Sequence, residues 1–193
     1  MTFPENTQGE SQRARKRRLE EGFYGDWCQG RGIDIGCGTD LLFTDIETWD
    51  MANGQGDATH MKGVEDSTFD FVYASHLLEH LDDPWAGLRS WYRIVKTGGH
   101  IIIAVPHRDL YEKKTELPSN WNKDHKKFWV LDRHKNQWTL GLIQTIHEAL
   151  MGKDYTLMLA RICMRNLTNA KDPTKHSWGE YSIEAVVKKG LIP

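Results

Sequence analysis

Several features that would indicate other classes of protein are scarce in this chain. Cysteine occurs only three times, widely spaced, which argues against a disulfide framework and against paired zinc ligands. The longest central apolar run, Ile101–Pro106, is far shorter than the roughly 18–20 residues of a membrane span. The opening residues MTFPENTQGE are polar and acidic and contain no secretory h-region. We therefore expect a cytoplasmic protein without a membrane span.

Excess charge of either sign is also missing. The chain has 25 basic and 27 acidic residues, a formal net charge of -2. This balance argues against a surface built as a whole to bind nucleic acid or anionic lipid. The basic residues instead gather locally, and the charged run Ser11–Glu21 favours a solvated helix or a disordered arm over a lid. With 193 residues and no internal repeat or low-complexity linker, residues 1–193 are predicted to form a single domain.

What is present is a strand–helix–strand pattern. The run Gly32–Ile35 predicts a buried strand that stops at a glycine-rich turn, and Phe69–Ala74 predicts a second strand. His100–Val105 is apolar on both faces, as an interior parallel strand requires. Between the last two, Asp83–Lys96 has apolar residues at three- and four-residue spacing and predicts a helix, capped by Asp82 or Asp83 and ended by Thr97-Gly98-Gly99.

The later part of the chain is less regular. Leu140–Leu150 predicts a helix, while Tyr155–Met164 and Ser182–Lys188 predict two strands that pair as an antiparallel hairpin at the sheet edge. The expected fold is therefore α/β, with a mostly parallel, Rossmann-like sheet, helices on both faces and an antiparallel edge strand.

The turn after the first strand is the first candidate for ligand binding. In open α/β sheets, ligands bind at the carboxyl ends of the strands, and glycines let them approach the backbone. Further along, Asp50 offers two acceptor oxygens suited to the hydroxyls of a ribose. Asp57 and the amide of Ala58 suit an exocyclic amine and a ring nitrogen. In this order the residues indicate an adenosine site.

Four segments resemble the class I S-adenosylmethionine-dependent methyltransferases, and above all the small methyltransferase-domain proteins of bacterial sugar and secondary-metabolite pathways. They are GIDIGCG, GDATHM, DSTFDFVYASHLLEHLDDP and WYRIVKTGGHIIIAVP, and the later segment HRDLYEKK…LPSNWNKDHKKFW resembles the same subgroup. The resemblance implies S-adenosylmethionine as cofactor and S-adenosylhomocysteine as product. It implies contacts to the methionine part from Asp34, Gly36, Cys37 and Gly38, to the ribose from Asp50, to the adenine from Asp57 and Ala58, and near the sulfonium from Ser75 and His76.

One departure from the family pattern affects the ribose assignment. Only eleven residues separate Gly38 from Asp50, too few for the usual helix after the glycine turn. We therefore expect an abbreviated first half of the sheet and a more open cofactor cleft. Asp45 and Glu47 remain alternatives to Asp50 as the acid that holds the ribose.

Acceptor-side residues are expected in residues 106–138, a substrate-side insertion that follows the central strand; residues 1–25 are expected to form a basic arm or helix. His107 and His125 are the candidate general bases. Tyr111 and Trp121 are candidates for an apolar wall, and Asp124 for a further substrate contact. His76 and His80 have the four-residue spacing of a metal pair, but no third ligand follows at a regular spacing, so no metal is predicted.

The predicted function is methyl transfer to a hydroxyl or amine of a small molecule such as a sugar, a glycolipid precursor or a natural product. A scaffold domain that binds the cofactor without catalysis is the main alternative. A nucleic-acid methyltransferase is disfavoured because the Asn/Asp-Pro-Pro-aromatic turn is missing at Ala74–Leu77. A nicotinamide oxidoreductase is disfavoured because Leu41 replaces the third glycine of the dinucleotide fingerprint. Oligomeric state is left open.

Overall fold

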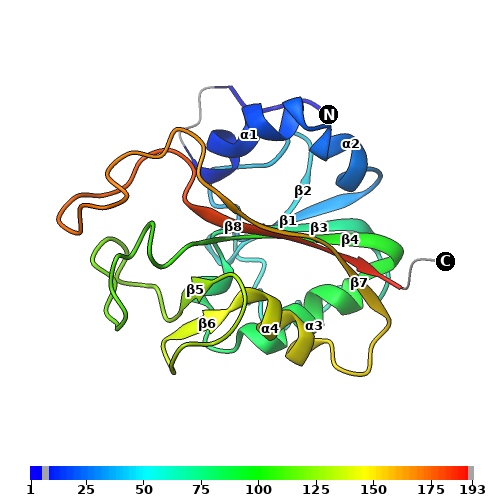
Figure 1. The fold of residues 1–193 in the computed structure, drawn as a ribbon. Coiled ribbons are helices and arrows are strands. Elements are labelled where there is room, and N and C mark those ends of the chain that lie inside the picture. The colour runs from blue at the N-terminus through cyan, green and yellow to red at the C-terminus, as the bar shows by residue number, and fades with distance from the viewer. Residues whose placement is uncertain (6–8, 191–193) are drawn as a thin grey trace.

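A computed structural model describes residues 1–5 and 9–190 of the chain. A six-stranded sheet in the order β2-β1-β3-β4-β8-β7 forms its centre, and a separate pair, β5-β6, lies beside it (Figure 1). The strands are β1 Gly32–Ile35, β2 Glu47–Trp49, β3 Phe69–Ser75, β4 Val95–Pro106, β5 Phe128–Val130, β6 Thr139–Gly141, β7 Tyr155–Cys163 and β8 Ser182–Lys189. The helices are α1 Glu10–Glu20, α2 Phe23–Trp27, α3 Pro84–Ile94 and α4 Leu142–Ala149, with 3-10 turns at Met51–Asn53 and Leu78–His80.

Strand directions agree with the prediction. β1, β2, β3 and β4 pair in parallel, β8 is antiparallel to β4, and β7 pairs antiparallel with β8 at the edge. Helices cover both faces: α1 and α2 lie on one side of the sheet and α3 and α4 on the other (Figure 1). The mostly parallel α/β fold with an antiparallel edge hairpin is thus confirmed.

Apolar strand residues supply two separate cores, because neighbouring side chains in a strand point to opposite faces. Ile33, Val72 and Ile103 face α3 and α4. Tyr73 and Ile102 face the aromatic residues of the α2 side. The central strands are buried on both faces, which explains why the sequence shows nearly continuous apolar runs rather than alternation.

Helix α3 begins as predicted and ends earlier. The Asp83 carboxylate accepts a hydrogen bond from the Ala86 N–H at 2.9 Å, and Pro84 occupies the first turn. The helix ends at Ile94, however, and β4 already begins at Val95. The prediction that Thr97-Gly98-Gly99 ends the helix was wrong, because Val95 pairs with Phe69 of β3 and draws the chain into the sheet before the glycines.

The first half of the fold is abbreviated. Residues 36–46, between β1 and β2, contain no helix, and a single 3-10 turn follows β2. The face left uncovered carries Phe71 and Tyr73, which pack with Phe23, Tyr24 and Phe43. Helices from the N-terminal segment thus cover the area that a longer β1–β2 connection would otherwise fill.

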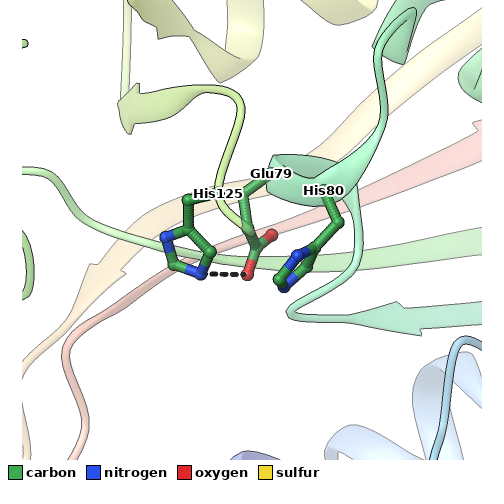
Figure 2. A group of neighbouring side chains, drawn as sticks. All are labelled: Glu79, His80 and His125. Carbon is green, nitrogen blue, oxygen red and sulfur yellow. Dashed lines mark ion pairs between the residues drawn. The ribbon is translucent and has the colours of Figure 1, made fainter. Parts of the chain in front are cut away.

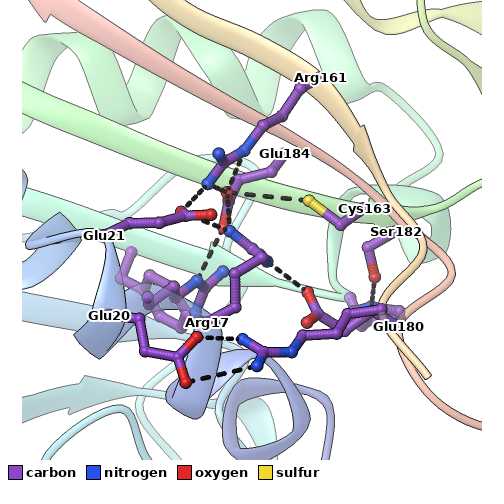
Figure 3. A network of polar contacts seen from close by, with 12 residues as sticks. Arg17, Glu20, Glu21, Arg161, Cys163, Glu180, Ser182 and Glu184 are labelled. Carbon is purple, nitrogen blue, oxygen red and sulfur yellow. Dashed lines mark hydrogen bonds and ion pairs between the residues drawn. The ribbon is translucent and has the colours of Figure 1, made fainter.

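Helix α1 is held by ion pairs rather than by an apolar face (Figure 3). The carboxylate of Glu184 on β8 binds Arg18 at 2.7 Å, Arg17 at 3.1 Å and Arg161 at 2.8 Å. Arg18 is only 1% exposed, and it also donates a hydrogen bond to the hydroxyl of Tyr73. The charged run is therefore a helix packed on the sheet, which the expectation of a solvated or disordered segment did not foresee.

Two long segments reach out from the same end of the molecule, at the carboxyl ends of the parallel strands. These are residues 107–127 and 164–181, which project on the left in Figure 1. In the described part of the chain, no helix has both the length and the apolarity needed to cross a membrane.

Candidate active site

The glycine turn links the first two strands. The Gly36 N–H donates to the Trp49 carbonyl at 2.8 Å, which ties the end of β1 to the end of β2. Gly36 and Gly38 both have positive φ, +69° and +51°, a region that favours glycine. A Cβ on Gly36 would lie 2.6 Å from the Leu77 side chain, whereas one on Gly38 would meet nothing within 4 Å. The backbone of Gly38 therefore borders open space. At Gly36, in contrast, a side chain would collide with Leu77.

Asp34 lies beneath this turn, with Cys37 beside it. Asp34 is only 1% exposed, and its carboxyl oxygen Oδ2 accepts a hydrogen bond from the Leu42 N–H at 2.8 Å. Burial raises the pKa of Asp34 to about 8, although the Leu42 amide opposes this shift. The carboxyl is therefore mostly protonated at neutral pH. Cys37 is also buried, so its amide and not its thiol is available at the turn.

Asp50 is the acid that meets the glycine turn. It follows β2 directly, and its Oδ2 accepts a hydrogen bond from the Gly38 N–H at 2.8 Å. Glu47 begins β2 and pairs through both oxygens with Arg31, at 2.6 and 2.9 Å. Asp45 lines a cavity of about 390 Å³ together with Arg31 and Glu47. These two alternatives lie toward the amino end of the strands, away from the turn.

Asp57 and Ala58 continue the same edge. Asp57 is exposed and its Oδ1 accepts from the Thr59 N–H at 2.8 Å. The Ala58 carbonyl accepts from the indole N–H of Trp91 at 3.0 Å, and Trp91 is fully buried in α3. The position of this loop is thus set by the opposite helical layer. The Asp57 carboxylate remains accessible from solvent.

The end of β3 brings Ser75 and His76 to this edge. Ser75 pairs with Ala104 of β4, and His76 follows in a left-handed conformation with φ of 54°. The ring Nε2 of His76 lies 2.9 Å from the Ser182 hydroxyl. Burial lowers the pKa of His76 to about 3, and the nearby His125 adds to that shift, so the ring is neutral at physiological pH.

These residues fit a nucleoside sulfonium cofactor. Asp34 lies within β1 near its carboxyl end, while Asp50 and Asp57 follow β2, and Asp50 binds the Gly38 amide. A ligand with cationic sulfur and ammonium groups suits carboxyl partners, and the hydroxyls of a ribose suit the acceptor oxygens of an aspartate.

Comparison with known proteins agrees with this geometry. Residues 49–103, which run from the last residue of β2 into β4 and include Asp50, Asp57 and His76, match the family described as "Methyltransferase domain". This segment of the chain is similar to the domains of that family. The ubiquinone biosynthesis O-methyltransferase of Vibrio parahaemolyticus is 31% identical over 70 residues, covering 32% of this chain and 30% of that protein. The chain therefore aligns with less than a third of the length of its curated relatives.

Solved structures extend the likeness to the whole fold. A SAM-dependent methyltransferase of Thermotoga maritima, described as a possible histamine N-methyltransferase, has a TM-score of 0.52 at 17% identity. The alignment covers 90% of this chain and 97% of that one. A structure from work on the conversion of a disulfide bond into a thioacetal group during echinomycin biosynthesis has a TM-score of 0.59 at 14% identity, covering 92% and 82%. The chain thus shares its overall fold with these SAM-dependent methyltransferases.

His107 follows β4, in the segment where the sequence predicts acceptor contacts. It is buried, and its Nδ1 accepts a hydrogen bond from the Asp109 N–H at 3.1 Å. The main-chain N–H of His107 donates to the Tyr181 carbonyl at 2.8 Å. Burial lowers the pKa of His107, so the ring is neutral and carries its proton on Nε2. With Nδ1 occupied and Nε2 protonated, His107 has no nitrogen free to take a proton.

His125 is better arranged to act as a base. Its Nδ1 lies 2.5 Å from the Glu112 carboxylate, and Glu112 is completely buried. The Ser119 hydroxyl donates to the other Glu112 oxygen at 2.5 Å. Because a carboxylate accepts, Nδ1 is the protonated nitrogen and Nε2 keeps a free lone pair. This is the base-and-orienting-acid arrangement of many hydrolytic and transferase sites.

Sequence reasoning missed the acid that orients His125. The neighbouring Asp124 was predicted as a substrate contact; its side chain is exposed and its N–H donates to Asn122. Glu112 lies thirteen positions before His125, and no periodicity connects the two. Only the folding of residues 107–127 back on themselves brings the two side chains together.

An aromatic cluster surrounds His125. The Tyr111 ring lies 5.6 Å from the His125 ring and 4.9 Å from that of Tyr181, centroid to centroid. Trp121 donates its indole N–H to the Tyr111 carbonyl at 2.8 Å and packs near His176 at 5.5 Å. Tyr111 and Trp121 thus lie in contact, while their role as a wall for a substrate stays a prediction. Tyr181 and His176, from the segment before β8, belong to the same cluster and were not predicted.

Proposed function

We propose that this chain transfers the methyl group of S-adenosylmethionine to a hydroxyl or amine of a small molecule. One observation carries the proposal: the carboxylate of Asp50, a residue of the segment that matches the methyltransferase-domain family, accepts a hydrogen bond from the Gly38 amide at the carboxyl edge of β1 and β2. The curated relatives are named as O-methyltransferases, which favours an oxygen acceptor. The aromatic cluster around Tyr111 favours a ring-bearing one.

The cofactor supplies a methyl group on cationic sulfur, and the protein's task is to bind, orient and handle protons. Asp34, Gly36, Cys37 and Gly38 would hold its methionine part, Asp50 its ribose, and Asp57 with Ala58 its adenine. Ser75 and His76 would lie near the reacting end. His76 is neutral and buried, so it adds no positive charge beside a cation.

On the acceptor side, His125 supplies the free lone pair at Nε2. Glu112 holds the imidazole in the required tautomer, and Tyr111 and Trp121 form the wall against which an acceptor ring packs. His107 positions the segment after β4, because its Nδ1 accepts from the Asp109 N–H and its Nε2 carries the ring proton. A well-placed proton acceptor contributes about 10²–10⁴-fold to rate when the nucleophile is a hydroxyl.

Calorimetric titration with S-adenosylmethionine and S-adenosylhomocysteine tests the cofactor site. We expect both to bind, and Asp50→Ala to weaken binding at least tenfold because the ribose loses a bidentate acceptor. Glu47→Ala is the matched control, since that acid lies at the other end of β2 and binds Arg31. If neither nucleoside binds the wild-type chain, the proposal is wrong and the scaffold alternative stands.

A second measurement tests the acceptor side. S-adenosylhomocysteine formation is followed with a panel of phenols, sugars and amines. We expect His125→Ala to lower turnover by about 10²-fold or more while leaving cofactor affinity unchanged. His134→Ala serves as control, because His134 pairs with Glu148 away from this edge. Full turnover in His125→Ala would contradict the role assigned to His125.

A further inference from the structure

Three side chains of metal-ligand type converge just beyond the end of β3. Glu79 and His80 belong to the 3-10 turn Leu78–His80, and His125 comes from the segment after β4. One possible ligand atom from each lies within 4.8 Å of the others. Figure 2 shows the Glu79 carboxylate between the two imidazole rings. The regular spacing of His76 and His80 had suggested a different pair, which the structure does not join in this group.

Glu79 is the most unusual member of the group. It is 0% exposed, and neither carboxylate oxygen has a hydrogen-bond partner among the described residues. Its main chain, in contrast, is fixed, because the carbonyl accepts from the N–H groups of Lys126 and Lys127 at 2.8 and 3.2 Å. A buried carboxylate without donors is costly, and proteins resolve such a group by protonating it, by pairing it or by placing a cation beside it; burial accordingly raises the pKa of Glu79.

The groups facing Glu79 supply no such cation. The nearest are His125 Nε2 at 3.9 Å and His76 Nδ1 at 3.6 Å. Glu112 and Glu10 add further negative charge to its surroundings. No lysine or arginine side chain makes an ion pair with Glu79 in the part of the chain that the structure describes. The site is therefore polar, acidic and short of positive charge.

His125 is prepared as a metal ligand. The buried carboxylate of Glu112 accepts a hydrogen bond from its Nδ1–H, which leaves the Nε2 lone pair directed toward Glu79. A carboxylate on the outer nitrogen of a ligating histidine is the usual support of a metal site, because it fixes the tautomer and raises ligand basicity. The Ser119 hydroxyl holds the other Glu112 oxygen and keeps the carboxylate in place.

We propose that Glu79, His80 and His125 bind one divalent transition-metal ion of the zinc class, with Glu112 supporting His125 from behind. Two imidazoles and one carboxylate are donors that zinc accepts, at about 2.0–2.2 Å from the metal. The 3.9 Å between His125 Nε2 and Glu79 Oε1 needs only a small side-chain movement to reach such bonds. Three protein ligands leave a fourth position for water or for an oxygen or nitrogen of a small ligand.

Metal binding requires neither the cofactor nor the acceptor, so the inference is independent of the proposed methyl transfer. A bound metal would, however, change the role of His125. A nitrogen that binds a metal has no lone pair for a proton, and the ion would then lower the pKa of a bound hydroxyl itself. The metal measurement therefore also decides how the Nε2 lone pair is used.

The test is metal retention by the full chain. Protein stripped with a chelator is loaded with Zn²⁺, dialysed, and analysed by elemental mass spectrometry, and Co²⁺ loading is followed by absorption in the visible range. We expect about one ion per chain in the wild type. The Co²⁺-loaded protein should show the visible absorption bands of a four-coordinate ion in a site of low symmetry. Glu79→Gln keeps the shape and removes the charge, so it should fold and lose metal affinity at least 100-fold.

Two further variants make the outcome decisive. Glu112→Gln should weaken metal binding by about 10–100-fold, as loss of an outer-nitrogen partner does. His134→Asn, which alters another histidine–glutamate pair, should bind as the wild type does. Wild-type protein that retains no more zinc than Glu79→Gln, or Co²⁺ bands equal in the two, would overturn the proposal. A failed methyl-transfer assay would not bear on it, because metal content is measured without substrate.

Discussion

At the scale of single residues, the candidate site depends on where a carboxyl group lies relative to water. Asp34, Asp50 and Asp57 are the same residue type in one short stretch, but Asp34 is buried and Asp57 is exposed. Burial raises the pKa of Asp34 to about 8, so it is a neutral group until a cation arrives. The three acids therefore have different chemistry at neutral pH.

This difference gives a prediction for Asp34. A raised pKa in the folded protein means that Asp34 favours folding at low pH, and that this contribution is lost as pH rises from about 4 to about 8. A cationic ligand beside the group favours the ionised form, so binding of S-adenosylmethionine at pH 7 should release close to one proton. Calorimetric titration in two buffers of different ionisation enthalpy measures the number of protons released.

Asp34→Asn is the informative variant. It should bind S-adenosylmethionine more weakly and release no proton, whereas Glu47→Gln should behave as the wild type does. Proton release that persists in Asp34→Asn would show that another group is responsible.

At the scale of elements, helix α1 shows how a polar segment is held to an apolar sheet. Glu184 of β8 is 1% exposed and binds three guanidinium groups, those of Arg17, Arg18 and Arg161 (Figure 3). Burial by itself would raise the pKa of Glu184, but the arginines outweigh it and lower the pKa to about 2. The helix is therefore attached through charge pairing, with aromatic rings of Phe23 and Tyr73 beside Arg18.

Removing the Glu184 charge should be strongly destabilising. Glu184→Gln leaves buried Arg18 without its partner, and we expect a loss of about 3–5 kcal/mol in the free energy of unfolding at pH 7. Because the folded pKa is depressed from 4.5 to about 2, this stabilisation is complete above pH 4.5 and is lost as pH falls through 2. The wild-type and variant stabilities should converge in that interval in urea unfolding.

A surface pair provides the control for this prediction. Arg31 and Glu47 form a two-point ion pair, but their side chains are 55% and 48% exposed. Glu47→Gln should cost less than about 1 kcal/mol, because exposed pairs gain little in water. Equal losses in the two variants would contradict the role given to burial.

At the scale of the whole molecule, the two halves of the site have different origins. The proposed cofactor half is built from the ends of β1, β2 and β3, which are fixed by the sheet. The proposed acceptor half is built from residues 107–127 and from the segment before β8, which meet through Tyr111, His125 and Tyr181. Parallel strands bring both halves to one edge because all their carboxyl ends lie on the same side.

Hydrogen exchange tests this division. Adding S-adenosylhomocysteine to the full chain should slow exchange in residues 36–58, where the glycine turn and the adenine loop lie, because their amides lose contact with water. Helices α3 and α4, on the other face, should change little. Protection confined to those helices would place the nucleoside elsewhere.

The sequence suggested the residues of the proposed cofactor half, whose role stays a prediction. The glycine turn, Asp34, Asp50 and Asp57 follow one another in order along the chain, and the strands that carry them are local apolar runs whose period can be read directly. The alternatives Asp45 and Glu47 differ from Asp50 by only a few positions, so their separation needed the register of β2 against β1. The end of α3 was misjudged because pairing with β3 overrode the glycines.

What the sequence by itself determined is therefore the chemistry that neighbours in the chain share: the α/β pattern, the glycine turn and its acids. Only the tertiary structure decided which acid supports His125, which carboxylate is buried without a partner, and how a charged helix becomes part of the core. Glu112, Glu79 and Glu184 each acquire their role from groups that lie far away in sequence. Burial and long-range pairing are properties of the packed chain, and no local pattern records them.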